Sequence, residues 1–114
     1  MQNVVLSEAL EDKVFKDIQA RIVKSFLDVM VLMELRNKPL GGYNVIAFIY
    51  KKLNILLSSG TVYSQLYYLE RNGLIKAHPN QRKREYTLTE KGKETVRAIL
   101  NIRDKVKVLV QYII

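Results

Sequence analysis

One segment, residues 58–73, combines side-chain types that are uncommon together on an ordinary surface helix. Ser58 and Ser59 suit a helix start, and Gly73 suits the left-handed residue that follows a helix end. At helical spacing, the apolar side chains fall on one side of this helix, namely Val62, Leu66 and Leu69. The other side carries hydroxyls, phenol rings and a guanidinium, from Thr61, Ser64, Tyr67, Tyr68 and Arg71. Because such groups bind base edges and phosphates, we expect a nucleic-acid recognition helix, with Ser59 and Gly60 at its start. One of the two tyrosines Tyr67 and Tyr68 could equally pack against a neighbouring helix.

A cationic hairpin is predicted directly after this helix. Residues 74–78 and 84–88 have the composition of short strands, and residues 79–83 form the turn between them. The tip of this hairpin contains Asn80, Gln81, Arg82, Lys83 and Arg84. A charge run of this kind is usually a solvated loop. Beside a recognition helix, however, we expect it to reach phosphates or the minor groove.

The charges of the chain are segregated along the sequence. The formal net charge is +8 over 114 residues. Residues 1–35 hold four basic and six acidic side chains, whereas residues 36–114 hold fifteen basic and five acidic ones. This asymmetry predicts a positive face with an anionic partner, for which nucleic acid is the first expectation and an anionic membrane surface the main alternative.

Two further helices are needed to position this pair of elements. Residues 7–36 predict a first helix, capped by Ser7, that is either continuous or divided near Gln19–Ala20. One apolar stripe runs along its start, from Leu10, Val14, Ile18 and Ile22. A Pro- and Gly-containing break at 37–42 precedes a second helix over 43–53. Near the end of the second helix stand two cations that we expect to contact phosphates, Lys51 and Lys52.

The end of the chain predicts a dimer contact. Thr89 can cap a single last helix that extends to Ile114, although residues 106–110 also suit a strand. Apolar residues recur along it at spacings of three and four, namely Ile99, Ile102, Val106, Leu109 and Ile113. With the stripe of Leu10, Val14 and Ile18, this surface exceeds what one small domain covers. We therefore expect a homodimer, with dimer contacts in 1–20 and 96–114 and a DNA-binding domain at 21–95.

Catalysis is not expected from this composition. The chain has no cysteine and one histidine, His78, so we expect no metal, no cofactor and no enzymatic activity. No apolar stretch of membrane-spanning length occurs, and the N-terminus does not resemble a signal peptide, so we expect a cytoplasmic protein. A small-molecule effector pocket lined by Tyr43, Tyr50 and Tyr67 is conceivable, but no spacing singles it out.

The predicted order of three helices, a hairpin and a helix is that of a winged helix-turn-helix, a mainly α fold with a small β-hairpin. The sequence also resembles PadR-type transcriptional regulators, in the MarR-like superfamily. The resemblance covers roughly residues 30–97 and rests on four segments, namely 42–46, 59–66, 69–75 and 84–94. The last of these is similar to the family pattern YxLTxKGxE. A family histidine before the Gly-Tyr pair is replaced here by Gly41.

The resemblance implies a dimeric DNA-binding repressor whose third helix enters the major groove. It also implies that Tyr63 either contacts the DNA backbone or packs beneath the recognition helix. We therefore expect a sequence-specific regulator that binds an inverted repeat in double-stranded DNA. The alternatives are a winged helix that contacts another protein and a non-specific nucleic-acid coating protein.

Overall fold

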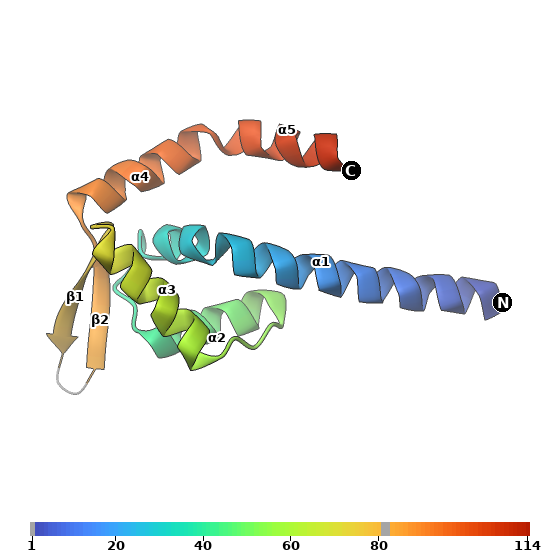
Figure 1. Cartoon of the computed structure of the whole chain (residues 1–114), viewed down its shortest axis with the longest axis horizontal. Helices are drawn as coiled ribbons and strands as arrows, with labels where there is room; N and C mark the ends of the chain where they lie inside the picture. The colour runs from blue at the N-terminus through green and yellow to red at the C-terminus, as the bar shows by residue number, and fades with distance from the viewer. Residues whose placement is uncertain (1, 81–82) are drawn as a thin grey trace.

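The computed structural model describes residues 2–80 and 83–114, and it is mainly helical with one two-stranded hairpin (Figure 1). The elements in chain order are α1 (Gln2–Glu34), α2 (Gly42–Leu53), α3 (Ser59–Arg71), β1 (Ile75–Asn80), β2 (Lys83–Leu88), α4 (Glu90–Asn101) and α5 (Arg103–Ile113). This arrangement confirms the predicted fold class. No helix of the described residues is long and apolar enough to cross a membrane.

The first helix is longer than the sequence pattern suggested. It begins at Gln2, so Ser7 lies inside it and is not its cap. No proline or glycine interrupts residues 2–37, which explains why nothing stops the helix at its predicted start. The helix is kinked at Phe26, where φ is −112° and ψ is 15°, and not near Gln19–Ala20. Its first half extends away from the other elements (Figure 1).

The hydrophobic core lies where the second half of α1, the helices α2 and α3, and the hairpin meet. Val31, Val45 and Val62 contribute one fully buried side chain from each of the three helices. The hairpin adds Tyr86, which is also fully buried. Its backbone pairs with Leu40, with N–H···O distances of 2.8 and 3.1 Å, and so joins β2 to the connection between α1 and α2.

The ends of the helices follow local chemistry. The Ser58 hydroxyl accepts a hydrogen bond from the Thr61 amide at 3.2 Å, and the Thr89 hydroxyl accepts one from the Gly92 amide at 3.0 Å. Gly73 has a φ of 75°, the left-handed conformation expected after α3. These three observations confirm the predicted boundaries of α3 and the predicted start of α4.

The C-terminal region differs from the single helix that we expected. The helix is interrupted at Ile102 (φ −98°, ψ 4°), which lies between the end of α4 and the start of α5. Asn101 and the β-branched Ile102 are weak helix formers, and Asp104 favours a new helix start in the first turn of α5. Residues 106–110 are helical, so the strand alternative is also wrong. The break divides the predicted apolar seam, since Ile99 packs against the core while Ile102 and the residues after it are exposed.

Candidate nucleic-acid interface

The two sides of α3 differ as the helical pattern predicts. Val62, Leu66 and Leu69 are buried, with relative exposures of 0–1%. The opposite side is exposed and consists of Ser59, Gly60, Thr61, Ser64, Tyr67, Tyr68 and Arg71. An added Cβ at Gly60 would meet nothing within 4 Å, so the backbone at the helix start is open to close approach. This face can present hydroxyls, aromatic rings and a cation to a groove of DNA.

Tyr67 and Tyr68 are both available at the surface. Their relative exposures are 47% and 49%, so neither ring is buried against a neighbouring helix. Tyr67 lies beside Tyr63 on α3, with ring centroids 6.2 Å apart and planes tilted by 34°. Rings exposed in this way can place apolar faces on sugars or thymine methyl groups while the hydroxyls donate or accept hydrogen bonds.

Tyr63 has a different environment from the other tyrosines of α3. It is half-buried and packs against the core. Its ring covers Gly42 at the start of α2, where an added Cβ would lie 2.5 Å from the ring carbon Cζ. Only a glycine fits beneath the ring without displacement. This packing favours the second role implied by the family resemblance, in which Tyr63 supports the recognition helix from below.

The two strands of the hairpin are antiparallel, with Pro79 opposite Arg84 and Asn80 opposite Lys83. Lys83 is exposed. Gln81 and Arg82, which were predicted to contact DNA, lie outside the described residues, as does the side chain of Asn80.

Arg84 is exposed but forms contacts within the chain. Its Nη2 lies 3.1 Å from both carboxylate oxygens of Glu70 on α3. Its guanidinium also lies over the Tyr86 ring, 5.7 Å from the ring centroid. The hydrogen bond to Glu70 is the main cause of a raised pKa for Arg84. Arg84 therefore joins the hairpin to α3.

The Tyr86 side chain beneath Arg84 is buried and its hydroxyl has no hydrogen-bond partner in the part of the chain that the structure describes. Burial raises the pKa of this phenol, and the neighbouring Arg84 charge partly opposes the shift.

Lys51 and Lys52 stand at the far end of α2 from the hairpin (Figure 1). Lys52 forms an ion pair with Glu34 at 3.4 Å and lies over the Phe48 ring, 5.8 Å from its centroid. Both lysines are exposed. The structure thus separates these two expected phosphate contacts from the hairpin.

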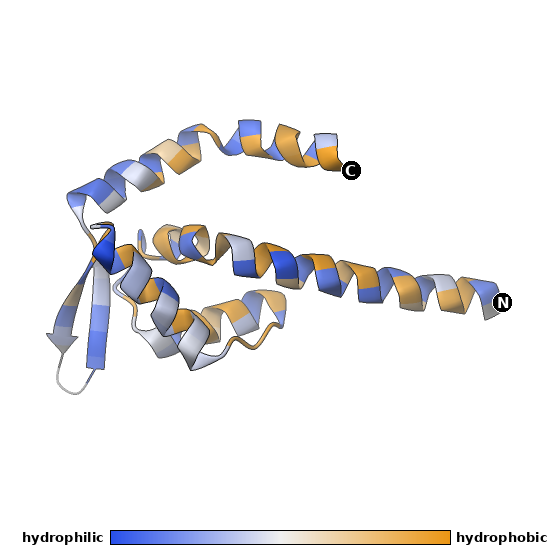
Figure 2. Cartoon of the chain, viewed as in Figure 1, coloured by the Kyte–Doolittle hydropathy of each residue, from blue (hydrophilic) through white to orange (hydrophobic). Residues whose placement is uncertain are grey.

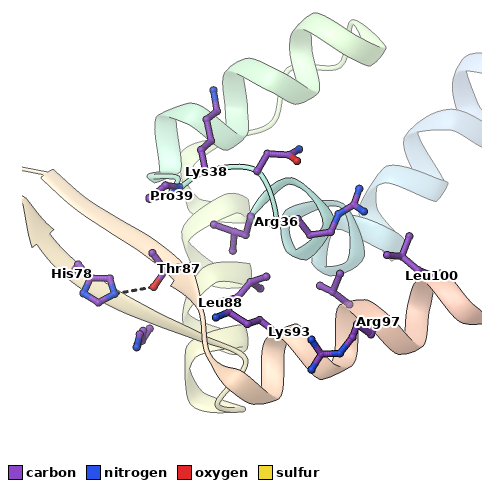
Figure 3. Close-up of a pocket in the computed structure, with 13 residues that line it drawn as sticks. Arg36, Lys38, Pro39, His78, Thr87, Leu88, Lys93, Arg97 and Leu100 are labelled. Atoms are coloured by element: carbon purple, nitrogen blue, oxygen red, sulfur yellow. Dashed lines mark hydrogen bonds between the residues drawn. The ribbon is translucent and has the colours of Figure 1, made fainter.

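A second cationic surface was not anticipated from the sequence. A hollow of about 720 Å³ lies between the end of α1, the hairpin and α4 (Figure 3). Among the residues that the structure describes, its lining contains no carboxylate and five lysines and arginines, namely Arg36, Lys38, Lys76, Lys93 and Arg97. His78 also lines it and shares a hydrogen bond of 2.8 Å with the Thr87 hydroxyl. These cations come from three segments that are distant in sequence, namely the connection after α1, β1 and α4, so no local pattern could reveal them. The hollow is not lined by the three tyrosines that the sequence offered as a conceivable effector pocket, Tyr43, Tyr50 and Tyr67.

Residues 31–98, more than half of the chain, match the model of the PadR-like family of transcriptional regulators. The chain belongs to this family. Its matched region runs from the buried half of α1 to α4 and includes the whole recognition helix and hairpin. The protein is thus a PadR-like transcriptional regulator with a winged helix, and the family consists of regulators rather than enzymes.

Solved structures show the same fold. A PadR-like transcriptional regulator from Bacillus cereus has a TM-score of 0.71 at 19% identity and covers 82% of this chain and 95% of its own. A winged-helix DNA-binding protein from STIV has a TM-score of 0.59 at 17% identity, with coverages of 74% and 91%. Bacillus subtilis PadR, solved in complex with operator DNA, has a TM-score of 0.59 at 26% identity, with coverages of 65% and 46%. No curated protein is significantly similar to this chain in sequence.

Proposed function

We propose that this PadR-like protein is a sequence-specific repressor that binds an inverted repeat in double-stranded DNA as a homodimer. The observation that carries the proposal is the exposed polar and aromatic face of α3 on a winged helix. A related protein, Bacillus subtilis PadR, was solved with operator DNA, which supports the same class of partner for this chain. The repressor role in this proposal rests on the family resemblance, which implies a dimeric DNA-binding repressor.

The proposed contacts divide into two groups. The α3 face reads base edges in the major groove, through Thr61, Ser64, Tyr67, Tyr68 and Arg71, with Ser59 and Gly60 at the phosphates. The hairpin tip contacts phosphates or the minor groove through Asn80, Gln81, Arg82 and Lys83. Lys51 and Lys52 are secondary phosphate contacts.

The dimer is proposed from uncovered apolar surface at both ends of the chain. Leu6, Leu10 and Phe15 on α1 are 60–67% exposed, and Leu109 and Ile113 on α5 are 59% and 74% exposed. In Figure 2 apolar and polar positions alternate along both helices, as expected of amphipathic contact surfaces. The proposed division is a dimer contact in 1–20, a DNA-binding domain at 21–95 and a second dimer contact in 96–114. The second contact rests on Ile102, Val106, Leu109 and Ile113, because Ile99 belongs to the core.

Selection of bound sequences from random duplex DNA tests the proposal. We expect an inverted repeat with half-sites about one helical turn apart, roughly 34–36 Å. Tyr68→Ala should reduce discrimination between the selected and random duplexes by about 1–3 kcal/mol. Tyr50→Ala is the matched control, because Tyr50 is similarly exposed, at 52%, but lies on α2. Selected sites without dyad symmetry, or an equal effect of the two substitutions, would contradict the proposal.

A further inference from the structure

Beyond the short connection from α3 into β1, where the Leu74 amide donates to the Leu69 carbonyl at 3.0 Å, two further contacts hold the hairpin. At its base, Tyr86 pairs by backbone hydrogen bonds with Leu40. Nearer the tip, the Arg84 side chain reaches Glu70 on α3 at 3.1 Å. Arg84 stands opposite Pro79, and only one further residue pair, Asn80 with Lys83, lies beyond it in the hairpin. The Arg84–Glu70 contact is thus the outermost described link between the hairpin and the recognition helix.

The chemistry of this pair also suits a supporting role. Glu70 is the only acidic residue of α3, and it follows the tyrosines Tyr67 and Tyr68 that face outward. A free carboxylate at this position would repel the phosphates of a bound duplex. Its pairing with Arg84 cancels that charge, and the Arg84 guanidinium is in turn held by Glu70 and the Tyr86 ring. Together the two side chains add no net charge to the interface.

We propose that Glu70 and Arg84 are positioning residues that fix the hairpin at the angle at which it and α3 engage the same site together. The inference rests on the proposed DNA-binding function. Neither residue reads a base or neutralises a phosphate. They hold the cations at the hairpin tip in a fixed position relative to the face of α3. This raises the affinity for a DNA site that fits both elements more than it raises the affinity for random DNA.

The opposite role for Arg84, a direct phosphate contact, makes different predictions. If charge alone mattered, Glu70→Gln would strengthen binding to every duplex, because it removes a negative charge. If the pair positions the hairpin, Glu70→Gln weakens binding to the selected duplex although it removes that charge. The double variant Glu70→Gln/Arg84→Met is informative for the same reason, since it keeps the net charge of the original protein.

The first experiment measures affinities of the full-length protein for the selected duplex and a random duplex over a range of salt concentrations. We expect Glu70→Gln and the double variant to bind the selected duplex about two- to thirtyfold more weakly, as for two exposed ion pairs in a dimer. Their salt slopes should be unchanged. Lys83→Met is the matched control from the same strand, and it should lower the salt slope by about 0.9 per protomer on both duplexes. Stronger binding by Glu70→Gln, or a reduced salt slope in the double variant, would overturn the inference.

The second experiment needs no DNA and separates this inference from the proposed function. Amide hydrogen exchange of β1 and β2 is compared in the free protein, in Glu70→Gln and in Lys83→Met. We expect about two- to fivefold faster exchange at the outer end of the hairpin in Glu70→Gln only. Unchanged exchange would overturn the positioning role even where a DNA site had been found. Failure to select any DNA sequence, with faster exchange in Glu70→Gln, would instead contradict the proposed function and leave the support of the hairpin established.

Discussion

Two parts of the molecule are rich in apolar side chains, but only one of them buries those side chains. In the winged helix, Val31, Val45 and Val62 from three helices are completely enclosed. In α5 no residue is buried, and residues 3–17 of α1 are all exposed. An apolar stripe therefore indicates that a helix packs against something without saying whether the partner lies in the same chain. The winged helix thus covers its own apolar side chains, whereas the first half of α1 and the whole of α5 leave theirs exposed.

The largest effect should come from the enclosed part. Leu66 on α3 is 1% exposed. Leu66→Ala should lower the free energy of unfolding by about 2–5 kcal/mol, because it leaves a cavity in a packed core. Urea titration at two protein concentrations measures this, and the loss should be the same at both. A loss below about 1 kcal/mol would show that the core is less closely packed than the structure indicates.

Substitutions on the exposed apolar faces should instead change the proposed monomer–dimer equilibrium. Leu109→Ser on α5 should weaken the dimer by about 1.5–3 kcal/mol per buried side chain, because the leucine is 59% exposed in the single chain. Sedimentation equilibrium measures the change, with Lys107→Ser as a control on the same helix. If Leu109→Ser leaves the monomer–dimer equilibrium of the original protein intact, α5 is not a dimer contact.

Two glycines sharpen the comparison within the winged helix. An added Cβ at Gly92 in α4 would collide with the Leu74 carbonyl oxygen, whereas the space around Gly60 in α3 is open. Gly92→Ala should therefore cost about 1–3 kcal/mol of unfolding free energy. Gly60→Ala should be neutral or stabilising by up to about 1 kcal/mol. Thermal unfolding of both variants tests this, and equal effects would contradict the close approach of α4 to the start of the hairpin.

The smallest effect is expected at Tyr86, whose buried hydroxyl lacks a hydrogen-bond partner among the described residues. Tyr86→Phe should leave the free energy of unfolding unchanged or raise it by up to about 1 kcal/mol. Burial raises the folded pKa of this phenol above its ordinary value of 10.0. The contribution of the buried phenol to the free energy of unfolding is therefore fully present below pH 10.0 and is lost as the pH rises through the folded pKa. The reason is that the phenol of Tyr86 ionises at a lower pH in the unfolded chain than in the folded one.

Urea titrations between pH 8 and 11 measure both parts of this prediction. The phenylalanine variant should lose the component of the alkaline decline that comes from Tyr86. Destabilisation of more than about 1 kcal/mol at neutral pH would indicate that the hydroxyl has a hydrogen-bond partner, which the described residues do not provide.

Local chemistry made much of the fold predictable. The caps Ser58 and Thr89 and the left-handed Gly73 place α3 and α4 because each acts on neighbouring backbone groups. The outward face of α3 was also predictable, since helical spacing alone separates it from Val62 and Leu66.

Features that depend on distant contacts were not predictable. The pairing of Arg84 with Glu70 joins residues 14 positions apart on different elements, and the same arginine looked like a free cation in the sequence. No proline or glycine near Phe26 indicates the kink in the sequence. The break at Ile102 interrupts an apolar repeat whose spacing is uninterrupted in the sequence. The ion pair depends on the position of another element, whereas the local residue types at the kink and at the break are too weak a signal to predict either.

The kink at Phe26 divides α1, so the angle there determines where the N-terminal end of the helix lies relative to the core. About 24 residues precede Phe26, a length of roughly 36 Å at the rise of an α-helix. A change of about 10° at Phe26 moves the far tip by about 6 Å, which is close to the axial length of two base pairs. A small change of the helix angle at Phe26 would thus displace the N-terminal end of α1 by a distance similar to the spacing of base pairs. In the proposed dimer, if it is joined through residues 1–20, the angle of α1 at Phe26 would contribute to the spacing between the two recognition helices.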